Sequence, residues 1–307
     1  MKADRFLTDL GLAPVSAVAP SEERFPDGAH YRIEIPSVEN PTILRHVLAE
    51  AKERGVVVNR VSQGSGSMLI TEKELDEMAL MASDNGIEIS LFVGPREGWD
   101  IGVQSRAADG PALAGQLRGT RQLRYGVEDV LRATEHGIRG FLIADLGLLE
   151  VLVGMQKAGD LPASTVWKIS AMLAPSNPIA MRQMERMGAS TVNVPSDLTP
   201  ELIAELRAVS SLPIDVYVEA PDAMGGVVRG HESAELIAIA APMYTKFGLR
   251  NSTPIYPAGM HNLDYASLLG REKVRRASLA LEWIKRSEIE LIQSPAGALG
   301  LGVPELG

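Results

Sequence analysis

The chain has 307 residues, 45% of them hydrophobic and 22% charged, which excludes a disordered or fibrous protein and predicts a packed core. A net charge of −9 without a cluster of Lys and Arg excludes nucleic acid as a principal partner. The absence of cysteine excludes disulfides, an iron–sulfur cluster, thiolate-bound zinc and a cysteine nucleophile.

The sequence contains no apolar run of the roughly 20 residues that spanning a bilayer requires. Residues 12–19 end in Ala-Val-Ala and faintly resemble a signal-peptide cleavage site, but Asp4, Arg5 and Asp9 interrupt the apolar stretch that such a peptide needs. We therefore expect a cytoplasmic protein without a membrane partner, with secretion as the alternative.

Short apolar runs alternate with amphipathic helical patterns along the whole chain. The eight predicted strands are 31–35, 56–61, 87–93, 140–145, 166–172, 191–194, 214–219 and 245–250. The predicted helices are 41–54, 72–85, 127–136, 148–158, 178–187, 200–209, 232–241 and 271–285. Because a helix separates consecutive strands, the sheet is expected to be parallel.

This alternation fits either a closed (β/α)8 TIM barrel or an open doubly wound sheet. An open sheet that binds a dinucleotide carries a glycine-rich loop after its first strand, whereas residues 36–40 here read Pro-Ser-Val-Glu-Asn. Eight strands and the missing glycine loop favour the barrel as a single domain.

Four parts of the chain are distinguished by their place in this pattern. Residues 1–28 are expected to cap the bottom of the barrel, and 29–294 form the barrel itself. A long loop insertion, 94–126, contains Trp99 and Arg106 and is the candidate lid, because long loops at the carboxyl ends of barrel strands commonly cover active sites. Residues 295–307, rich in Gly, Ala and Leu, are predicted to be a flexible tail.

Alternate residues of a barrel strand face the axis, while the others pack beneath the helices and must be apolar. The apolar phase of the first strand leaves Arg32 and Glu34 facing inward, and that of the last leaves Lys246 and Arg250 facing inward. The predicted axial set is Arg32, Glu34, Lys168, Asn193, Tyr217, Glu219 and Arg250. Buried charges must be paired or line a wet pocket, so this set is either an ion-pair network or an anion-recognising site; we favour the site.

The loops after the seventh and eighth strands commonly bind phosphate or carboxylate in such barrels. Two glycines let backbone amides approach an anion, guanidinium groups grip it and hydroxyls add hydrogen bonds. The residues predicted to bind substrate here are Gly225, Gly226, Arg229, Arg250, Ser252 and Thr253. The alternative is an ordinary surface loop.

Three charged residues are the catalytic candidates. Lys168 would be a Schiff-base nucleophile if burial lowered its pKa, or else an ion-pair partner of Glu34 or Glu219. Glu34 and Glu219 are also candidate general bases, or ligands of a divalent metal if one is present. His231 and His261, in the late loops, are possible acid–base groups.

The late segments resemble a barrel family known as the collagenase-like peptidases, the thirty-second family of unassigned mechanism. Glu219 before a loop with Gly225 and Gly226 is similar to the family's strand-end Glu and glycine loop. Residues 246–250, Lys-Phe-Gly-Leu-Arg, followed by Ser252 or Thr253, are similar to its late Lys-x-x-x-Arg strand. The resemblance implies a (β/α)8 core and a peptidase-like hydrolase with Glu219 and Arg250 in its site, but the chain lacks the cysteines of the family.

Three functions therefore remain open. The first is an enzyme that acts on a small phosphorylated or carboxylated metabolite by lyase, aldolase-like or isomerase-like chemistry. The second is a peptidase-like hydrolase, and the third is a noncatalytic barrel that binds a ligand or a protein. Helical faces rich in Met and Leu leave a homo-oligomer possible.

Overall fold

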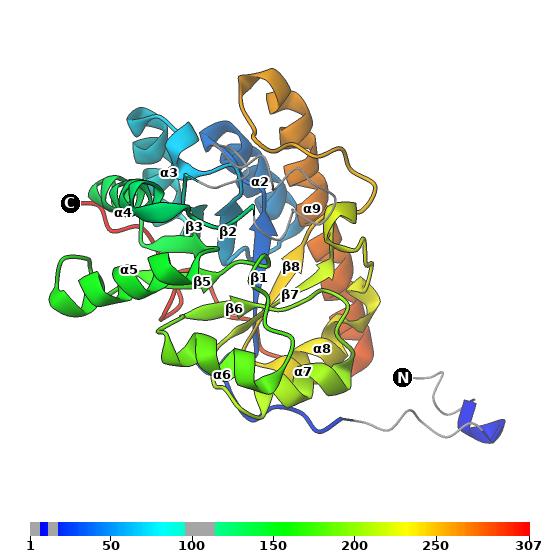
Figure 1. The fold of residues 1–307 in the computed structure, drawn as a ribbon. Coiled ribbons are helices and arrows are strands. Elements are labelled where there is room, and N and C mark those ends of the chain that lie inside the picture. The colour runs from blue at the N-terminus through cyan, green and yellow to red at the C-terminus, as the bar shows by residue number, and fades with distance from the viewer. Residues whose placement is uncertain (1–6, 12–17, 96–113) are drawn as a thin grey trace.

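The computed structural model describes residues 7–11, 18–95 and 114–307. Within these residues, eight parallel strands close into a barrel in chain order, with β8 pairing with β1. The helices lie around the outside of the strands (Figure 1). The predicted (β/α)8 TIM barrel is confirmed, and the open-sheet alternative is wrong.

The strands follow the predicted order with two displacements. Their bounds are β1 (Tyr31–Pro36), β2 (Arg60–Gln63), β3 (Glu88–Phe92), β4 (Gly140–Ile143), β5 (Val166–Ile169), β6 (Thr191–Asn193), β7 (Ile214–Glu219) and β8 (Met243–Phe247). Strand β2 begins at Arg60 rather than at 56, and β8 ends at Phe247 rather than at 250. Just beyond Phe247, Gly248 still contacts the end of β7 by donating its N–H to the Glu219 carbonyl at 2.7 Å.

Five of the described helices that cover the barrel begin at a residue whose side chain caps the first turn. Their bounds are α2 (Pro41–Arg54), α3 (Glu72–Asp84), α4 (Gly119–Glu135), α5 (Leu146–Ala158), α6 (Pro178–Arg186), α7 (Pro200–Arg207), α8 (Ser233–Ala240) and α9 (Leu263–Ser287). Thr71 and Thr199, for example, each accept a backbone N–H of the first helical turn. Helix α9 begins at Leu263, earlier than the predicted 271.

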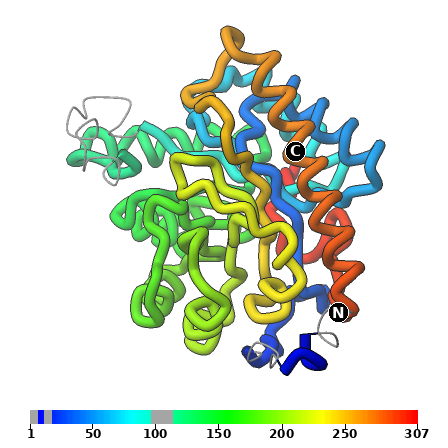
Figure 2. The backbone as a smooth tube through the Cα atoms, turned by 90° about the vertical axis from the view of Figure 1, so that its right-hand side faces the viewer, coloured from blue at the N-terminus to red at the C-terminus, as the bar shows by residue number. Residues whose placement is uncertain are grey.

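The core lies between the outer face of the strands and the inner faces of the helices. Ile33 and Ile35 of β1 are fully buried there, as the predicted strand phase requires. Helices α2 and α9 pack side by side over this part of the barrel (Figure 2). Gly270 permits their close approach, because a Cβ at this position would lie 3.0 Å from Cγ2 of Val47.

Two segments far apart in the sequence, around Phe25 and within the C-terminal tail, lie at the bottom of the barrel. Phe25 packs against Tyr244 there, with ring centroids 5.3 Å apart. The C-terminal tail, predicted to be flexible, is hydrogen-bonded there: Gly302 donates to Glu88 and Glu305 donates to the Gly137 carbonyl. Composition alone missed these contacts, because backbone groups of any residue type can make them.

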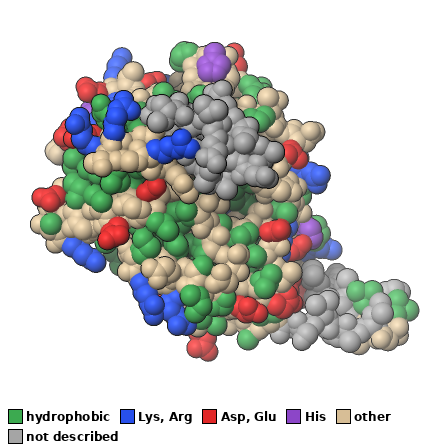
Figure 3. All heavy atoms as spheres, in the orientation of Figure 1, with side chains coloured by type: hydrophobic (Ala, Val, Ile, Leu, Met, Phe, Trp, Pro, Cys, Tyr) green, Lys and Arg blue, Asp and Glu red, His purple; other side chains and the backbone are tan. Residues whose placement is uncertain are grey.

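The predicted lid is only partly visible. Residues 96–113, which include Trp99 and Arg106, lie outside the described residues, and Gly119 already belongs to α4. None of the described helices combines the length and the apolar character needed to cross a membrane. On the face drawn in Figure 3, the described acidic and basic side chains are interspersed rather than gathered by sign.

Candidate active site

The inward faces of the strands carry a buried cluster of charged side chains. Each of its members is at most 2% exposed. The members are Glu34 (β1), Arg60 (β2), Glu88 (β3), Lys168 (β5), Asp215 (β7) and Lys246 (β8). Three cations thus face three carboxylates, which is the balance that burial of charge requires.

Arg60 is the centre of the lower part of this cluster. Its Nε lies 2.6 Å from Glu88 Oε1, and its Nη1 lies 3.2 Å from Asp215 Oδ2 and 3.3 Å from Glu34 Oε2. Its guanidinium carbon lies 3.4 Å from the centroid of the Tyr244 ring. An ion-pair network, the alternative to the favoured anion site, is therefore present below the cavity, but its centre is Arg60, which does not belong to the predicted axial set.

Glu34 links this network to two lysines above it. Its Oε1 accepts hydrogen bonds from Lys168 Nζ and, at 2.8 Å, from Ser62 Oγ. The same Oε1 lies 3.4 Å from Lys246 Nζ. Lys246 Nζ also donates to Asn193 Oδ1 and lies 4.1 Å from the centre of the Tyr217 ring. One carboxylate is therefore shared by two ammonium groups.

Glu34, Lys168 and Lys246 form a triad at the floor of the site, and the pKa values of Glu34 and Lys168 depart from those of the free side chains. Burial, helped by the positive charges of Lys246 and Arg60, lowers the pKa of Lys168 to about 7 against the pull of Glu34. Burial alone would raise the pKa of Glu34, but Lys168, Lys246 and Arg60 outweigh it and hold that pKa below its ordinary value. Glu34 is therefore ionised at neutral pH, while Lys168 loses its proton far more readily than an ordinary lysine.

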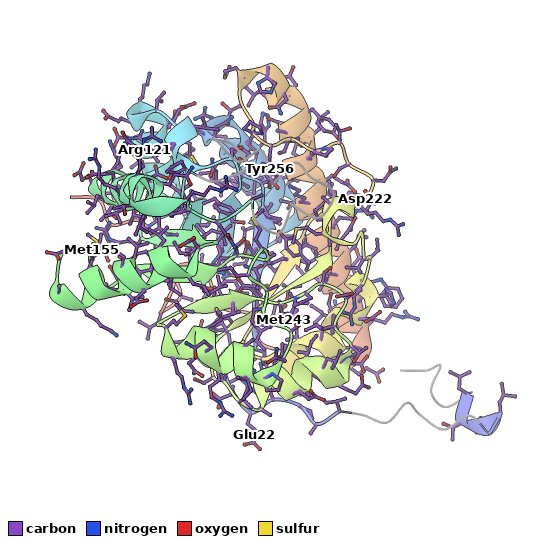
Figure 4. The ribbon with its side chains drawn as sticks, in the orientation of Figure 1. Glu22, Arg121, Met155, Asp222, Met243 and Tyr256 are labelled. Carbon is purple, nitrogen blue, oxygen red and sulfur yellow. The ribbon has the colours of Figure 1, made fainter. Side chains whose placement is uncertain are left out.

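A cavity of about 770 Å³ opens at the carboxyl ends of the strands, above the triad. Asn193, Tyr217 and Lys246 line it from the barrel axis, whereas Lys168 is not among its lining residues. Figure 4 shows Tyr256 and Asp222, two other lining residues, at the end of the barrel opposite Met243 and Glu22. Lys246, rather than Lys168, is therefore the amine that a bound molecule would meet at this position.

Tyr256 covers one side of the cavity. Its hydroxyl lies 2.5 Å from Ser37 Oγ, and its ring lies so close to Gly64 that a Cβ there would be 2.5 Å from ring atoms. Ser37 has φ 64, a left-handed conformation that is rare for a residue with a side chain. Backbone strain of this kind persists where the surroundings impose it and is common at ligand sites.

Two predicted members of the site lie elsewhere. A β-bulge between Tyr217 and Glu219 interrupts the alternation, and Glu219 instead lies 3.5 Å from Arg276 and accepts the N–H of Arg250. Glu219 is not a lining residue of the cavity and does not meet Glu34. The side chain of Arg250 is 61% exposed, 3.6 Å from Asp222, because β8 ends before it. The structure therefore does not bring Glu34 and Glu219 together, as a shared role as bases or metal ligands would require.

Of the loop residues predicted to bind an anion, some line the cavity and others do not. Gly225, Ser252 and Thr253 line the cavity, while Gly226 does not. Arg229 is held by Glu232 at 2.9 Å and by the Leu198 carbonyl at 2.7 Å, so it fastens one loop to another.

The remaining candidates lie at the bottom or on the surface. Arg32 points to the bottom, where it donates to Ser294, Tyr244 and the Leu299 carbonyl. His231 and His261 are exposed and are not lining residues of the cavity.

Arg60, Glu88 and Asp215 were not predicted to belong to the site, and Lys246 was predicted to face the axis but not to take part in the site. Glu88 and Asp215 occupy inward positions of correctly predicted strands, so the alternation rule could have found them. Among the described residues, no group of three His, Asp or Glu side chains is placed to hold a metal ion.

Lys168 gives the stability of the protein a predictable pH dependence. Because its pKa is about 7 in the folded protein and 10.5 ordinarily, the unfolded chain binds more protons between these values. The free energy of unfolding therefore gains a contribution that rises with pH over this range, by up to about 1.4 kcal/mol per pH unit. The free energy of unfolding is measured by urea unfolding at about pH 7, 8 and 9, within the range set by that linkage. Its increase per pH unit is expected to be smaller in Lys168→Met than in the wild type.

The control for this measurement is Lys157→Met, which removes an exposed lysine of α5 and is expected to leave the slope unchanged. Equal slopes in the wild type and Lys168→Met would show that Lys168 keeps an ordinary pKa in the folded protein.

No protein-family model and no curated protein matches the sequence. Among solved structures, CutC from Streptococcus agalactiae, named for copper homeostasis, is 14% identical, with a TM-score of 0.47 over 70% of this chain and 97% of its own. A U32 peptidase is 18% identical, with a TM-score of 0.41 over 65% of this chain and 73% of its own. A structure named native KDPGal is 12% identical, with a TM-score of 0.46 over 86% of this chain and 99% of its own. The likeness is one of barrel architecture and does not establish membership in the peptidase family.

Proposed function

We propose that this protein is a barrel enzyme for a small anionic metabolite with a carbonyl group, and that Lys246 forms an imine with that carbonyl during a lyase or isomerase reaction. The observation that carries the proposal is the place of Lys246. Its side chain lines the 770 Å³ cavity, while its ammonium contacts Asn193, Tyr217 and the buried carboxylate of Glu34. A lysine so placed can attack a bound carbonyl once it is neutral.

Glu34 and Lys168 supply a route for the proton that Lys246 must lose. Glu34 Oε1 contacts both ammonium groups, and the pKa of Lys168, lowered by burial to about 7, leaves a large fraction of this lysine neutral. The proton passes from Lys246 through Glu34 to Lys168. The neutral Lys246 amine then adds to the carbonyl carbon, and its two remaining protons leave with the carbonyl oxygen as water when the C=N bond forms.

The imine, once protonated, draws electrons from the neighbouring carbon and so favours loss of a proton or breakage of a carbon–carbon bond there. Burial raises the pKa of Tyr217, so its phenol stays protonated at neutral pH and is available as a proton donor in the cavity. Asn193 donates to the Ile169 carbonyl and accepts from Lys246, which holds the amine in place.

Borohydride reduction tests the proposal, since it converts an imine into a stable secondary amine. With pyruvate as the carbonyl probe, the wild-type protein is expected to gain one carboxyethyl group, and peptide mapping is expected to locate it on Lys246. Adducts confined to exposed lysines such as Lys285, or no adduct on a folded protein, would contradict the proposal.

The two alternatives predict different results in the same preparation. A peptidase-like hydrolase is expected to contain a stoichiometric divalent metal, which elemental analysis of the purified protein would detect. A noncatalytic barrel is expected to bind small carbonyl acids without forming a reducible adduct.

A further inference from the structure

A second lysine reaches the same cavity from outside the barrel strands. Lys273 lies on α9, one turn after Leu269, and both residues line the cavity. The side chain of Lys273 is 4% exposed, so its charge has been taken out of water almost completely. Such a charge requires hydrogen-bond partners or a counter-ion.

The partners of Lys273 are incomplete. An ammonium group has three N–H donors, and among the described residues the only hydrogen bond of this one goes to the Pro36 carbonyl, at 2.8 Å. Glu39 is close enough to interact electrostatically, but its carboxylate accepts the backbone N–H groups of Gly64 and Ser65, at 2.9 and 2.8 Å. Donors of Lys273 are thus left for a molecule in the cavity.

We propose that Lys273 binds a carboxylate group of the substrate whose carbonyl Lys246 attacks, an assignment that rests on the proposed function. The enzyme's substrate class is then an oxo acid, held at its carbonyl end from the barrel axis and at its acid end from α9.

The charges around Lys273 favour a carboxylate over a phosphate. Burial raises the pKa of Glu39, which favours its neutral form beside Lys273. One ammonium then balances a single negative charge better than the two charges that a phosphate monoester carries near neutral pH. Two lining residues next to Lys273, Pro36 and Leu269, are apolar and offer no further cation to a dianion.

Matched carbonyl probes test this assignment through the concentration that gives half-maximal borohydride labelling of Lys246. Pyruvate and levulinate are each compared with the ketone in which a methyl group replaces the carboxylate, acetone and pentan-2-one, and hydroxyacetone phosphate is compared with hydroxyacetone. In the wild type, the concentration for half-maximal labelling is expected to be lower for at least one oxo acid than for its matched ketone, by a factor on the order of ten or more. The acid with the largest ratio of ketone concentration to acid concentration is the one whose length fits the spacing between Lys246 and Lys273.

In Lys273→Met this advantage of the acid is expected to disappear, while labelling by the ketone remains. Lys273→Gln is a second variant should the methionine protein unfold, and Lys285→Met on the exposed face of the same helix is the matched control, expected to behave as the wild type. An acid advantage that survives in Lys273→Met, or a Lys273-dependent preference for the phosphate, would overturn the assignment.

Should no probe label the wild type, the imine proposal fails and Lys273 is judged separately. Acetate binding, measured by line broadening in carbon NMR, is then the readout. Weaker binding in Lys273→Met than in the wild type would support the carboxylate site, and equal binding would overturn it.

Discussion

A Lys246→Met variant is expected to lose borohydride-dependent labelling by pyruvate completely, and any carbon-bond chemistry later found for the enzyme is expected to fall by about a thousandfold or more. The reason is that the two neighbouring lysines have other places: Lys168 does not line the cavity and is held by Glu34, while Lys273, which does line it, is assigned to the acid end of the probe rather than to its carbonyl. Methionine nearly conserves the volume of the lysine stem, so the change removes the amine without opening a large cavity.

Lys246→Arg separates two possible duties of this residue. Arginine keeps the positive charge beside Glu34 but cannot form the imine, since it stays protonated at any pH that proteins withstand. If Lys246 acts through its amine, both variants lose labelling and activity. If it acts only through its charge, Lys246→Arg is expected to retain most of the activity, which would contradict the imine mechanism.

Replacing Arg60 with methionine is expected to lower the free energy of unfolding by about 3–5 kcal/mol, the cost of leaving buried charges without their partner. Glu88 would lose its ion pair of 2.6 Å, and three carboxylates would face only Lys168 and Lys246. Urea unfolding at neutral pH measures the effect. The control is Arg45→Met, which removes an exposed ion pair with Glu77 and is expected to cost less than about 1 kcal/mol.

A double variant sharpens this test. Removing the orphaned carboxylate as well, in Arg60→Met/Glu88→Leu, is expected to restore part of the lost stability, because the desolvated charge is gone. A double variant as unstable as the sum of the two single variants would show that Arg60 and Glu88 contribute independently. The network would then not be the unit that its geometry suggests.

The strand phase was predictable where the sheet is regular. In β1 and β5 the apolar residues Ile33, Ile35 and Ile169 must lie beneath the helices, and this alone directs Glu34 and Lys168 toward the axis. The same rule places Asn193 and Tyr217 at the cavity, where the structure has them. A hydrophobic pattern with a period of two residues therefore carries much of the information on the floor of the site.

The rule fails where the hydrogen-bonded ladder stops or shifts. The bulge in β7 turns Glu219 toward α9, and the early end of β8 leaves Arg250 in solvent, although both residues continue the inward phase in the sequence. Arg60 was missed for a related reason. The second strand was predicted over 56–61, which put Arg60 near its end, whereas β2 begins at Arg60. Lys273 has no signal in its own helix, because only the packing of α9 against the barrel brings it to the cavity.

The most direct test of the central claim is a crystal structure of the protein after borohydride reduction in the presence of pyruvate. The expected result is electron density that continues from Lys246 Nζ into the cavity beside Asn193 and Tyr217. Density that shows an unmodified Lys246, with the adduct on a lysine outside the cavity, would contradict the assignment of this residue as the reacting amine.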